Sequence, residues 1–348
     1  MDKRTSLRKS DLGFSLVELL VATAITLVSL LIIVQVFSVY DGWKRTTTGT
    51  AQSQENGLLG AFSIERDLRH AGFGMIGLGC PRINAYRAIA GLVPISATGL
   101  PVTITQDDPV AGTDRINVLY SSSPFGNIAA RLQAPMADSD APLVVDNGVG
   151  FNQGDMVVIS QSQPPADCSI LQLSQDATGA GTSWDLPHGP MPWNPQASVP
   201  FGYLSGVGAQ VLNLGQLVDR SYFVQNNVLR MAERNMVTGN VDTFDLIPGV
   251  VGLRARYGRD TAIPNPLDGV LDTFDNDTVA LRAAGANTLV AVQISLIVRS
   301  GNWERTEVSP AAIEYWPGEA LAIGADDRHY RYRVFQTVVP LKNTIWNN

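Results

Sequence analysis

The feature that most constrains this chain is a long apolar run close to its N-terminus. The run "LVELLVATAITLVSLLIIV" (residues 16–34) contains one charged residue, Glu18, in 19 positions. As a helix it would be about 28 Å long, close to the hydrocarbon thickness of a bilayer. Thr23, Thr26 and Ser29 interrupt it only mildly, because their hydroxyls can donate to the helix's own carbonyls. The run therefore predicts a membrane-spanning helix.

The residues around the run indicate how such a helix is oriented and processed. The first 13 residues hold four basic and two acidic side chains, which predicts a cytoplasmic N-terminus and a body outside the cytoplasm. The stretch after the run has no small-residue cleavage site of the kind that ends a secretory signal. A glycine instead precedes it, in the order Gly13, Phe14 and, four residues later, Glu18.

The segment "GFSLVE" after a short basic leader resembles the class III signal of type IV pilins and pseudopilins. The resemblance implies that a membrane prepilin peptidase cuts between Gly13 and Phe14 and methylates the new amine. It also implies that Glu18 pairs with the Phe14 amine of a neighbouring subunit during assembly, which relieves the cost of an unpaired carboxylate in apolar surroundings. The alternative is a plain signal anchor whose Glu18 snorkels to the cytoplasmic interface.

The helix is predicted to continue past the membrane to about residue 70, through a polar stretch with three glycines that is a weak helix former. Near its end, Ala61, Ile64 and Leu68 fall on one face and are expected to pack on the body. Arg66 and Asp67 are expected to point elsewhere.

From residue 71 onward, short β-rich runs are bounded by turn residues, without regular helices between them. This pattern predicts an α+β fold, with the long N-terminal helix packed on one contiguous, antiparallel β-sheet body with long loops. Asn226-Asn227 is a two-residue turn signal, and Pro340 indicates that the last strand ends there or lies at a sheet edge. The runs interpreted as strands are 115–123, 154–161, 168–175, 221–231, 287–300 and 331–343.

Five blocks of the body resemble, in their order, PilW-type minor pilins: "ERDLRHAGFGM", "GDMVVIS", "GVVGLRARYGRD", "VAVQISLIVRS" and "RVFQTVVPLKN". The resemblance implies a leader (residues 1–13), a transmembrane and assembly helix (14–70) and a globular body (71–348). It implies a subunit that primes type IV pilus assembly and lies at or near the pilus tip. Such pili serve twitching motility, adhesion and, in some bacteria, DNA uptake.

The same resemblance implies where the chain resides and what it meets. Before assembly it would be anchored in the inner membrane through residues 14–40, with its body in the periplasm; afterwards it would be in the pilus at the cell surface. Its partners would be prepilin peptidase, other minor pilins, the major pilin and the inner-membrane assembly platform. Two alternatives remain open: a J-type minor pseudopilin of type II secretion, and an adhesin or DNA-binding module displayed at the tip.

Catalysis, cofactors and nucleic acid are not expected. There is no nucleophile elbow, phosphate loop or zinc motif, and His70, His188 and His329 are far apart in the sequence. The segment "GFGMIG" (72–77) has the glycine spacing of a dinucleotide-binding loop, but such a loop follows a strand and begins a helix. Here the segment follows a predicted helix, which its glycines should end, and no helix is predicted after it. The net charge of −7 becomes −9 without the leader, which gives the body no electrostatic reason to bind nucleic acid.

The two cysteines, Cys80 and Cys168, belong to no CxxC pair. In an exported body they are expected to form one disulfide, worth about 4–5 kcal/mol on the chain-entropy model. Two separate buried thiols are the alternative.

Two further segments have charge patterns that resemble binding sites, one for a metal ion and one for single-stranded nucleic acid. Asp268, Asp272 and Asp275 lie in the acidic segment 258–277, which would be a calcium loop if its carboxylates converged; prolines interrupt it, so a solvated loop is expected and no metal is assigned. In the segment 326–335, arginines alternate with tyrosines, a pattern that can bind single strands but is expected here to be one strand with two faces. The residues that alternate are Arg328, Tyr330, Arg331, Tyr332 and Arg333.

Overall fold

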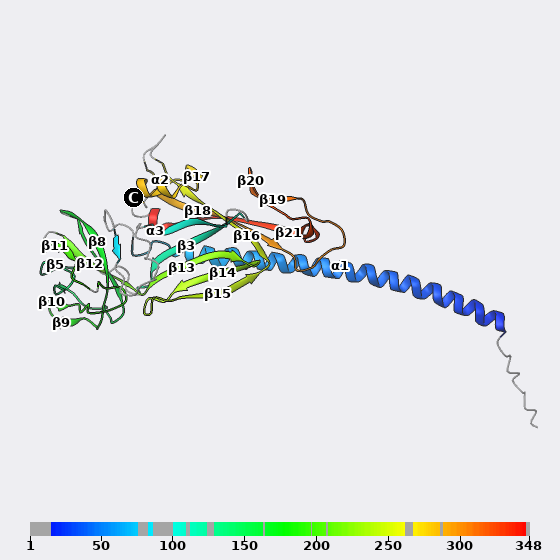
Figure 1. The fold of residues 1–348 in the computed structure, drawn as a ribbon, viewed down its shortest axis with the longest axis horizontal. Helices are drawn as coiled ribbons and strands as arrows, with labels where there is room; N and C mark the ends of the chain where they lie inside the picture. The colour runs from blue at the N-terminus through cyan, green and yellow to red at the C-terminus, as the bar shows by residue number, and fades with distance from the viewer. Residues whose placement is uncertain are drawn as a thin grey trace, which may run out of the picture. The chain divides into compact units, whose positions relative to one another are not determined.

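The computed structural model describes residues 15–75, 83–85, 100–108, 112–123, 129–162, 164–195, 197–206, 208–261, 267–285 and 288–345. The chain divides into two compact units, Met1–Ala51 and Gln52–Asn348, and each is described by itself. One helix, α1 (Leu16–His70), begins in the first unit and ends in the second (Figure 1). The predicted α+β layout, a long N-terminal helix followed by a body of mainly antiparallel sheets, is confirmed.

In the first unit, α1 is a helix whose apolar side chains are exposed over its whole first half. It is the one helix among the described residues that is long and apolar enough to cross a membrane, judged by length and composition. The hydroxyls of Thr23 and Thr26 donate to the carbonyls of Leu20 and Ala22 at 2.9 and 2.7 Å, as predicted. The polar interruptions therefore leave no unsatisfied hydroxyl at these two positions.

In the second unit, two antiparallel sheets share one hydrophobic core with the end of α1. Their strand orders are β15-β14-β13-β3-β2 and β17-β16-β18-β21. The strands are β2 (Val102–Asp108), β3 (Thr113–Ser121), β13 (Leu217–Gln225), β14 (Val228–Arg234), β15 (Val241–Pro248), β16 (Val250–Arg259), β17 (Thr273–Asp275), β18 (Leu289–Arg299) and β21 (Tyr332–Pro340). The smaller elements beside them are α2 (Thr278–Ala284), β19 (Ala312–Trp316), β20 (Glu319–Ala322), η2 (Asp326–His329) and α3 (Lys342–Ile345).

The end of α1 packs closely because small residues face the sheets. A side chain on Gly57 would overlap the ring of Phe335 in β21, and one on Gly60 would touch Leu296 in β18 at 3.3 Å. Ile64 and Leu68 are fully buried in the shared core, and Ala61 packs against it. The predicted packing face of the helix is thus confirmed.

Three local sequence signals also had the predicted result. Asn226 and Asn227 form the turn between β13 and β14 with φ angles of 53° and 57°, the left-handed region that asparagine tolerates. The last strand, β21, lies at the edge of its sheet and ends at Pro340. After α1, Gly72 and Gly74 adopt φ angles of 76° and 80°, which no continuing helix could use.

A large insertion separates two strands that are direct neighbours. Ser121 in β3 pairs with Leu217 in β13, yet 95 residues lie between them, here called the inserted region (residues 122–216). Its strands make small sheets of their own, which Figure 1 shows in green. They are β4 (Ala129–Arg131), β5 (Met136–Asp138), β6 (Val144–Val145), β7 (Met156–Ser162), β8 (Pro165–Gln172), β9 (Thr178–Ala180), β10 (Ser183–Asp185), β11 (Pro200–Tyr203) and β12 (Ala209–Gly215); β1 (Ile83–Ala85) joins β8 in parallel.

Candidate functional site

The N-terminal end of α1 holds the residues expected to act in processing and assembly. Gly13 and Phe14 lie outside the described residues, so the cleavage site stays a prediction. Glu18 is exposed, and its Oε2 accepts a hydrogen bond from the backbone N–H of Ser15 at 3.0 Å. A carboxylate in the first turn is favourable, because the free N–H groups of a helix start carry partial positive charge. Within this chain Glu18 has no cationic partner among the described residues.

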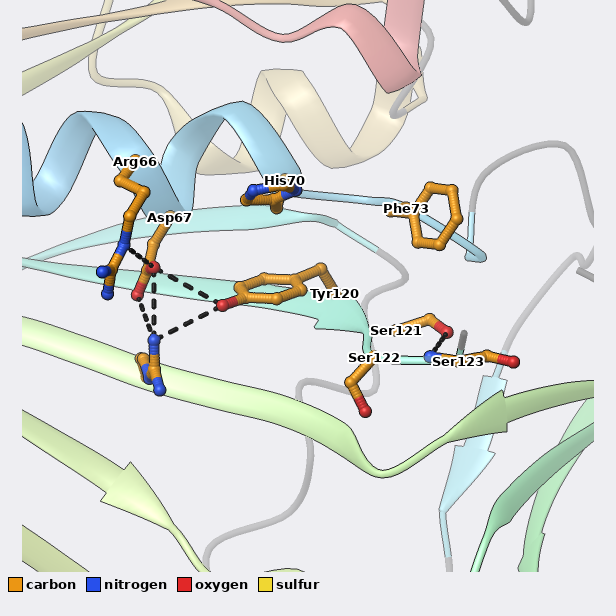
Figure 2. Close-up of a pocket in the computed structure, with 9 residues that line it drawn as sticks. Arg66, Asp67, His70, Phe73, Tyr120, Ser121, Ser122 and Ser123 are labelled. Carbon is orange, nitrogen blue, oxygen red and sulfur yellow. Dashed lines mark hydrogen bonds and ion pairs between the residues drawn. The ribbon is translucent and has the colours of Figure 1, made fainter. Parts of the chain in front are cut away.

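The best-connected charged cluster lies at the other end of α1, around Asp67, which is only 1% exposed. From β13, Arg220 Nη1 donates to Oδ1 and Oδ2 of Asp67 at 3.2 and 3.1 Å. The Tyr222 hydroxyl donates to Oδ2 at 2.7 Å, and the Tyr120 hydroxyl lies 3.4 Å from Oδ1. Figure 2 shows Arg66 and Tyr120 approaching the same carboxylate from opposite sides. We call these five residues the Asp67 cluster.

The expectation that Asp67 points away from the packed face is therefore wrong. The carboxylate lies on the flank of α1 that faces β13, where Arg220 compensates the charge and two tyrosines complete its hydrogen bonds. Arg220 also contacts Glu233 in β14 at 3.1 Å, so the cluster extends across two strands. Arg220 and Tyr222 each lie about 150 positions after Asp67, and the sequence pattern offered no signal for these two contacts.

The surroundings of the Asp67 cluster raise the pKa values of its two tyrosines and of Arg220, which preserves the hydrogen bonds and the ion pair of the cluster. Burial, together with the charge of Asp67, raises the pKa of Tyr120 to about 12 and raises the pKa of Tyr222 further. Burial would lower the pKa of Arg220, but the adjacent Asp67 and Glu233 together outweigh burial and raise that pKa. At neutral pH the tyrosines are therefore neutral donors and Arg220 is a cation, so the cluster is a fixed clamp between α1 and the sheet.

A pocket of about 510 Å³ opens beside the clamp. The rings of His70 and Tyr120 lie 5.6 Å apart along it, and Phe73 lies beyond them (Figure 2). The Ser121 hydroxyl donates to the Leu214 carbonyl at 2.7 Å, so it is already used within the fold. The lining residues are Arg66, Asp67, His70, Phe73, Tyr120, Ser121, Ser122, Ser123 and Arg220. Most charged and hydroxyl groups that line the pocket are bonded within the protein, which favours a structural role for this part of the surface.

A second buried cluster comes from the block "GLRARYGRD". Asp114 in β3 accepts hydrogen bonds from Arg254 Nη1 at 2.7 Å and from the backbone N–H of Ala255 at 2.9 Å. Arg256 Nη2 donates to Glu319 Oε2 at 2.8 Å and its guanidinium lies 4.0 Å over the Trp316 ring. Burial raises the pKa of Asp114 despite Arg254. These contacts fasten the β19–β20 hairpin onto β16.

The acidic segment uses its carboxylates within the protein. Asp260 Oδ2 accepts the backbone N–H groups of Asp268 and Gly269 at 2.9 and 2.6 Å. Asp272 accepts from Thr261, and Asp275 pairs with Arg259 at 2.6 Å. Throughout the part of the chain that the structure describes, no group of three His, Cys, Asp or Glu residues could hold a metal ion. Residues 262–266 of this segment lie outside that part.

Two of the three arginines of segment 326–335 pair with carboxylates, whereas Arg333 is exposed and forms no ion pair with the described residues. Arg331 makes two hydrogen bonds to Glu304, at 2.6 and 3.0 Å, and Arg328 pairs with Glu307 at 3.0 Å. Paired arginines have little charge left for a phosphate backbone. The prediction that the segment is one strand is wrong for its first part, because Asp326–His329 form the short helix η2 and β21 begins only at Tyr332. The pairing of Arg328 and Arg331 counts against a site for single strands.

The cysteine prediction concerns one described and one undescribed residue. Cys168 in β8 is buried at 1% exposure and is not a free thiol. Ile83 in β1 lies beside it in the parallel pairing. Cys80 lies outside the described residues, so the pairing of the two cysteines stays a prediction.

Comparison with known families agrees with this geometry. The model described as "Prokaryotic N-terminal methylation motif" matches residues 8–34, which cover Gly13, Phe14, Glu18 and the apolar run. An N-terminal methylation motif that opens a long apolar helix, followed by a β-sheet body, is the arrangement that the resemblance to type IV pilins and pseudopilins implies.

The particular family follows from the body. The model described as "Type IV Pilus-assembly protein W" matches residues 220–343, from β13 to α3. The two matches confirm the resemblance to PilW-type minor pilins and support a type IV pilus minor pilin. No curated protein and no solved structure matches the chain.

Proposed function

We propose that this chain is a minor pilin that primes type IV pilus assembly and is incorporated at or near the pilus tip together with other minor pilins. Its role is structural: it is processed by prepilin peptidase and then packs its helix among those of other subunits. Twitching motility, adhesion and DNA uptake are the activities that such a pilus would support. The body would lie in the periplasm before assembly, with residues 14–40 in the inner membrane.

The observation that carries the proposal is a membrane-length helix that starts at a methylation motif and has one carboxylate in its first turn. The apolar side chains around Glu18 are exposed, with Leu19 and Leu20 both at 61%, so other apolar surfaces must cover them in lipid or in a filament. Cleavage before Phe14 would create an amine four residues from Glu18. In a neighbouring subunit that amine would be the cation that Glu18 lacks, and the pair would set the register between helices.

The test replaces Glu18 by alanine in cells that lack the wild-type gene. Glu18→Ala should leave cleavage intact but reduce incorporation into sheared pili at least tenfold, because the mutant helix lacks the charge that fixes its register. Thr23→Ala is the matched control, since it also removes a polar side chain from the apolar run but only loses a bond to the Leu20 carbonyl.

Equal incorporation of Glu18→Ala and wild type would refute the assembly role of Glu18. Deletion of the gene separates the pilus from the secretion alternative. Loss of surface pili supports the proposal, whereas normal pili with a secretion defect would identify a J-type pseudopilin instead.

A further inference from the structure

The inserted region is an addition to a framework that closes without it. β3 and β13 pair continuously from Ser121 and Leu217 to Ile116 and Tyr222, as two strands joined by a tight turn would. The matches to the methylation motif and to the pilus-assembly family cover residues 8–34 and 220–343, and neither includes the inserted region. The 95 residues therefore serve something other than completing the sheet around α1.

The inserted region has its own interior. One hydrophobic core consists only of its residues, among them Met136, Val157 and Tyr203, each at most 1% exposed. The full set of its buried members is Ala130, Leu132, Met136, Leu143, Val145, Phe151, Val157, Ile159, Leu171, Leu173, Leu186, Tyr203, Ala209 and Val211. A separate hydrophobic core of this size allows the inserted region to keep its own surface in a fixed shape.

The module is also fixed to the framework. Trp193 is fully buried, and its Nε1 donates to the carbonyl of Met236 at 2.8 Å. Gln172 Nε2 donates to the same carbonyl at 3.2 Å. A second core joins Leu119 and Leu217 of the framework to residues of the insertion. The inserted region is thus held rigidly at the end of β3 and β13, where α1 also ends: Gly72 N–H donates to the Leu119 carbonyl at 2.9 Å.

Its charge differs from that of the framework. The inserted region contains seven aspartates and Arg131, without lysine or glutamate, for a formal charge of −6; the rest of the chain holds 24 basic and 25 acidic residues, for −1. Among the described residues of the framework, eleven arginines pair with carboxylates: Arg66, Arg69, Arg220, Arg230, Arg234, Arg254, Arg256, Arg259, Arg299, Arg328 and Arg331.

Six of the seven aspartates of the insertion are not neutralised in this way by the described residues. Among the described residues, six of them form no ion pair: Asp138, Asp140, Asp146, Asp155, Asp176 and Asp185. They are spread over the region from β5 to β10 and the loops between, so the field belongs to the whole module rather than to one site. A surface of one sign attracts partners of the opposite sign and repels nucleic acid and anionic lipid.

We propose that the inserted region is a recognition module carried by the pilin framework, and that it binds a basic protein surface. The framework supplies processing and assembly; the module, held rigidly on it, presents uncompensated negative charge to lysine- and arginine-rich partners. Desolvated contacts would then fix the partner, while the long-range field would raise the association rate and make it sensitive to salt.

The experiment measures binding of purified, processed full-length chain to an oligo-arginine peptide and to an oligo-glutamate peptide of equal length, at low and physiological salt. The module variant is Asp140→Lys with Asp185→Lys, two exposed aspartates that hold no ion pair. The matched framework variant is Asp242→Lys with Asp326→Lys, which makes the same change in net charge at exposed positions of β15 and η2. Incorporation into pili is scored for both variants in parallel.

Wild-type chain should bind the oligo-arginine peptide and not the oligo-glutamate peptide. The module variant should bind it at least tenfold more weakly at low salt, the framework variant should stay within about twofold of wild type, and both should enter pili normally. Equal weakening in the two variants, or no binding by wild type, would overturn the proposal. Loss of incorporation in the module variant alone would also overturn it, because the insertion would then act in assembly. Failure of the wild type itself to enter pili would count against the minor-pilin function and not against the module.

Discussion

Replacing Asp67 by alanine tests how the second half of α1 is fastened to the body. The substitution removes the carboxylate that Arg220 contacts through two oxygens. The Arg220 guanidinium, which is 19% exposed, would then keep Glu233 as its partner and face the Tyr120 hydroxyl. Removing one partner of a buried ion pair costs about 3–5 kcal/mol, because the other charge stays buried without compensation. We therefore expect Asp67→Ala to lower the free energy of unfolding by that amount.

A matched control lies two residues away on the same helix. Glu65 pairs with Arg69 at the surface, and an exposed i, i+4 pair contributes about 0.3–0.5 kcal/mol. Glu65→Ala should therefore unfold at nearly the wild-type denaturant concentration. The assay is urea unfolding of the full chain in detergent, followed by tryptophan fluorescence, with unchanged slopes as the sign that only stability has changed.

A double-variant cycle isolates the ion pair from the loss of packing. If the clamp is real, Asp67→Ala combined with Arg220→Ala should cost less than the sum of the two single changes, because the stranded guanidinium is gone. Additive costs, or an Asp67→Ala variant within about 1 kcal/mol of wild type, would refute the reasoning.

Three further outcomes are expected. Gly57→Ala should destabilise the chain by about 1–3 kcal/mol, because the new methyl group overlaps Phe335, whereas Gly42→Ala, with no atom within 4 Å, should not; urea unfolding compares them. The pKa of Tyr120, raised to about 12 from 10.0, makes its contribution to stability fully present below pH 10 and lost as pH rises towards 12, so alkaline unfolding should shift to higher pH in Tyr120→Phe. Peptide mapping of unreduced exported chain should recover the predicted disulfide, and two separate cysteine peptides would refute it.

The sequence was informative where the structure depends on neighbouring residues. The apolar run, the glycines after α1, the Asn226-Asn227 turn and the edge strand ending at Pro340 each follow from chain-local chemistry. The buried face of α1 was also predictable, since Ile64 and Leu68 recur with the helical period.

The sequence was uninformative where distant residues decide the outcome. Asp67 looked like a surface residue because its partners, Arg220 and Tyr222, come from a strand about 150 positions later. The pairing of Asp114 with Arg254 spans 140 positions. Neither pair has a spacing signal, and a buried charge cannot be told from an exposed one until the strand order is known.

The insertion was missed for a related reason. Its longest strands, β7, β8 and β12, have seven or eight residues, as several strands of the framework do, so the sequence was interpreted as one contiguous body. Only the pairing of Ser121 with Leu217 shows that the chain leaves the sheet and returns to the same place. A change in charge density, from −1 over the rest of the chain to −6 within residues 122–216, was the signal that could have revealed it.

The most direct test of the account is the mass of the N-terminal peptide of the chain isolated from piliated cells. The account predicts a peptide that begins at Phe14 and carries one additional methyl group on its amine, together with loss of the 13-residue leader. A chain that retains Met1, or one that begins after the apolar run, would contradict the assignment as a pilin and with it the role given to Glu18.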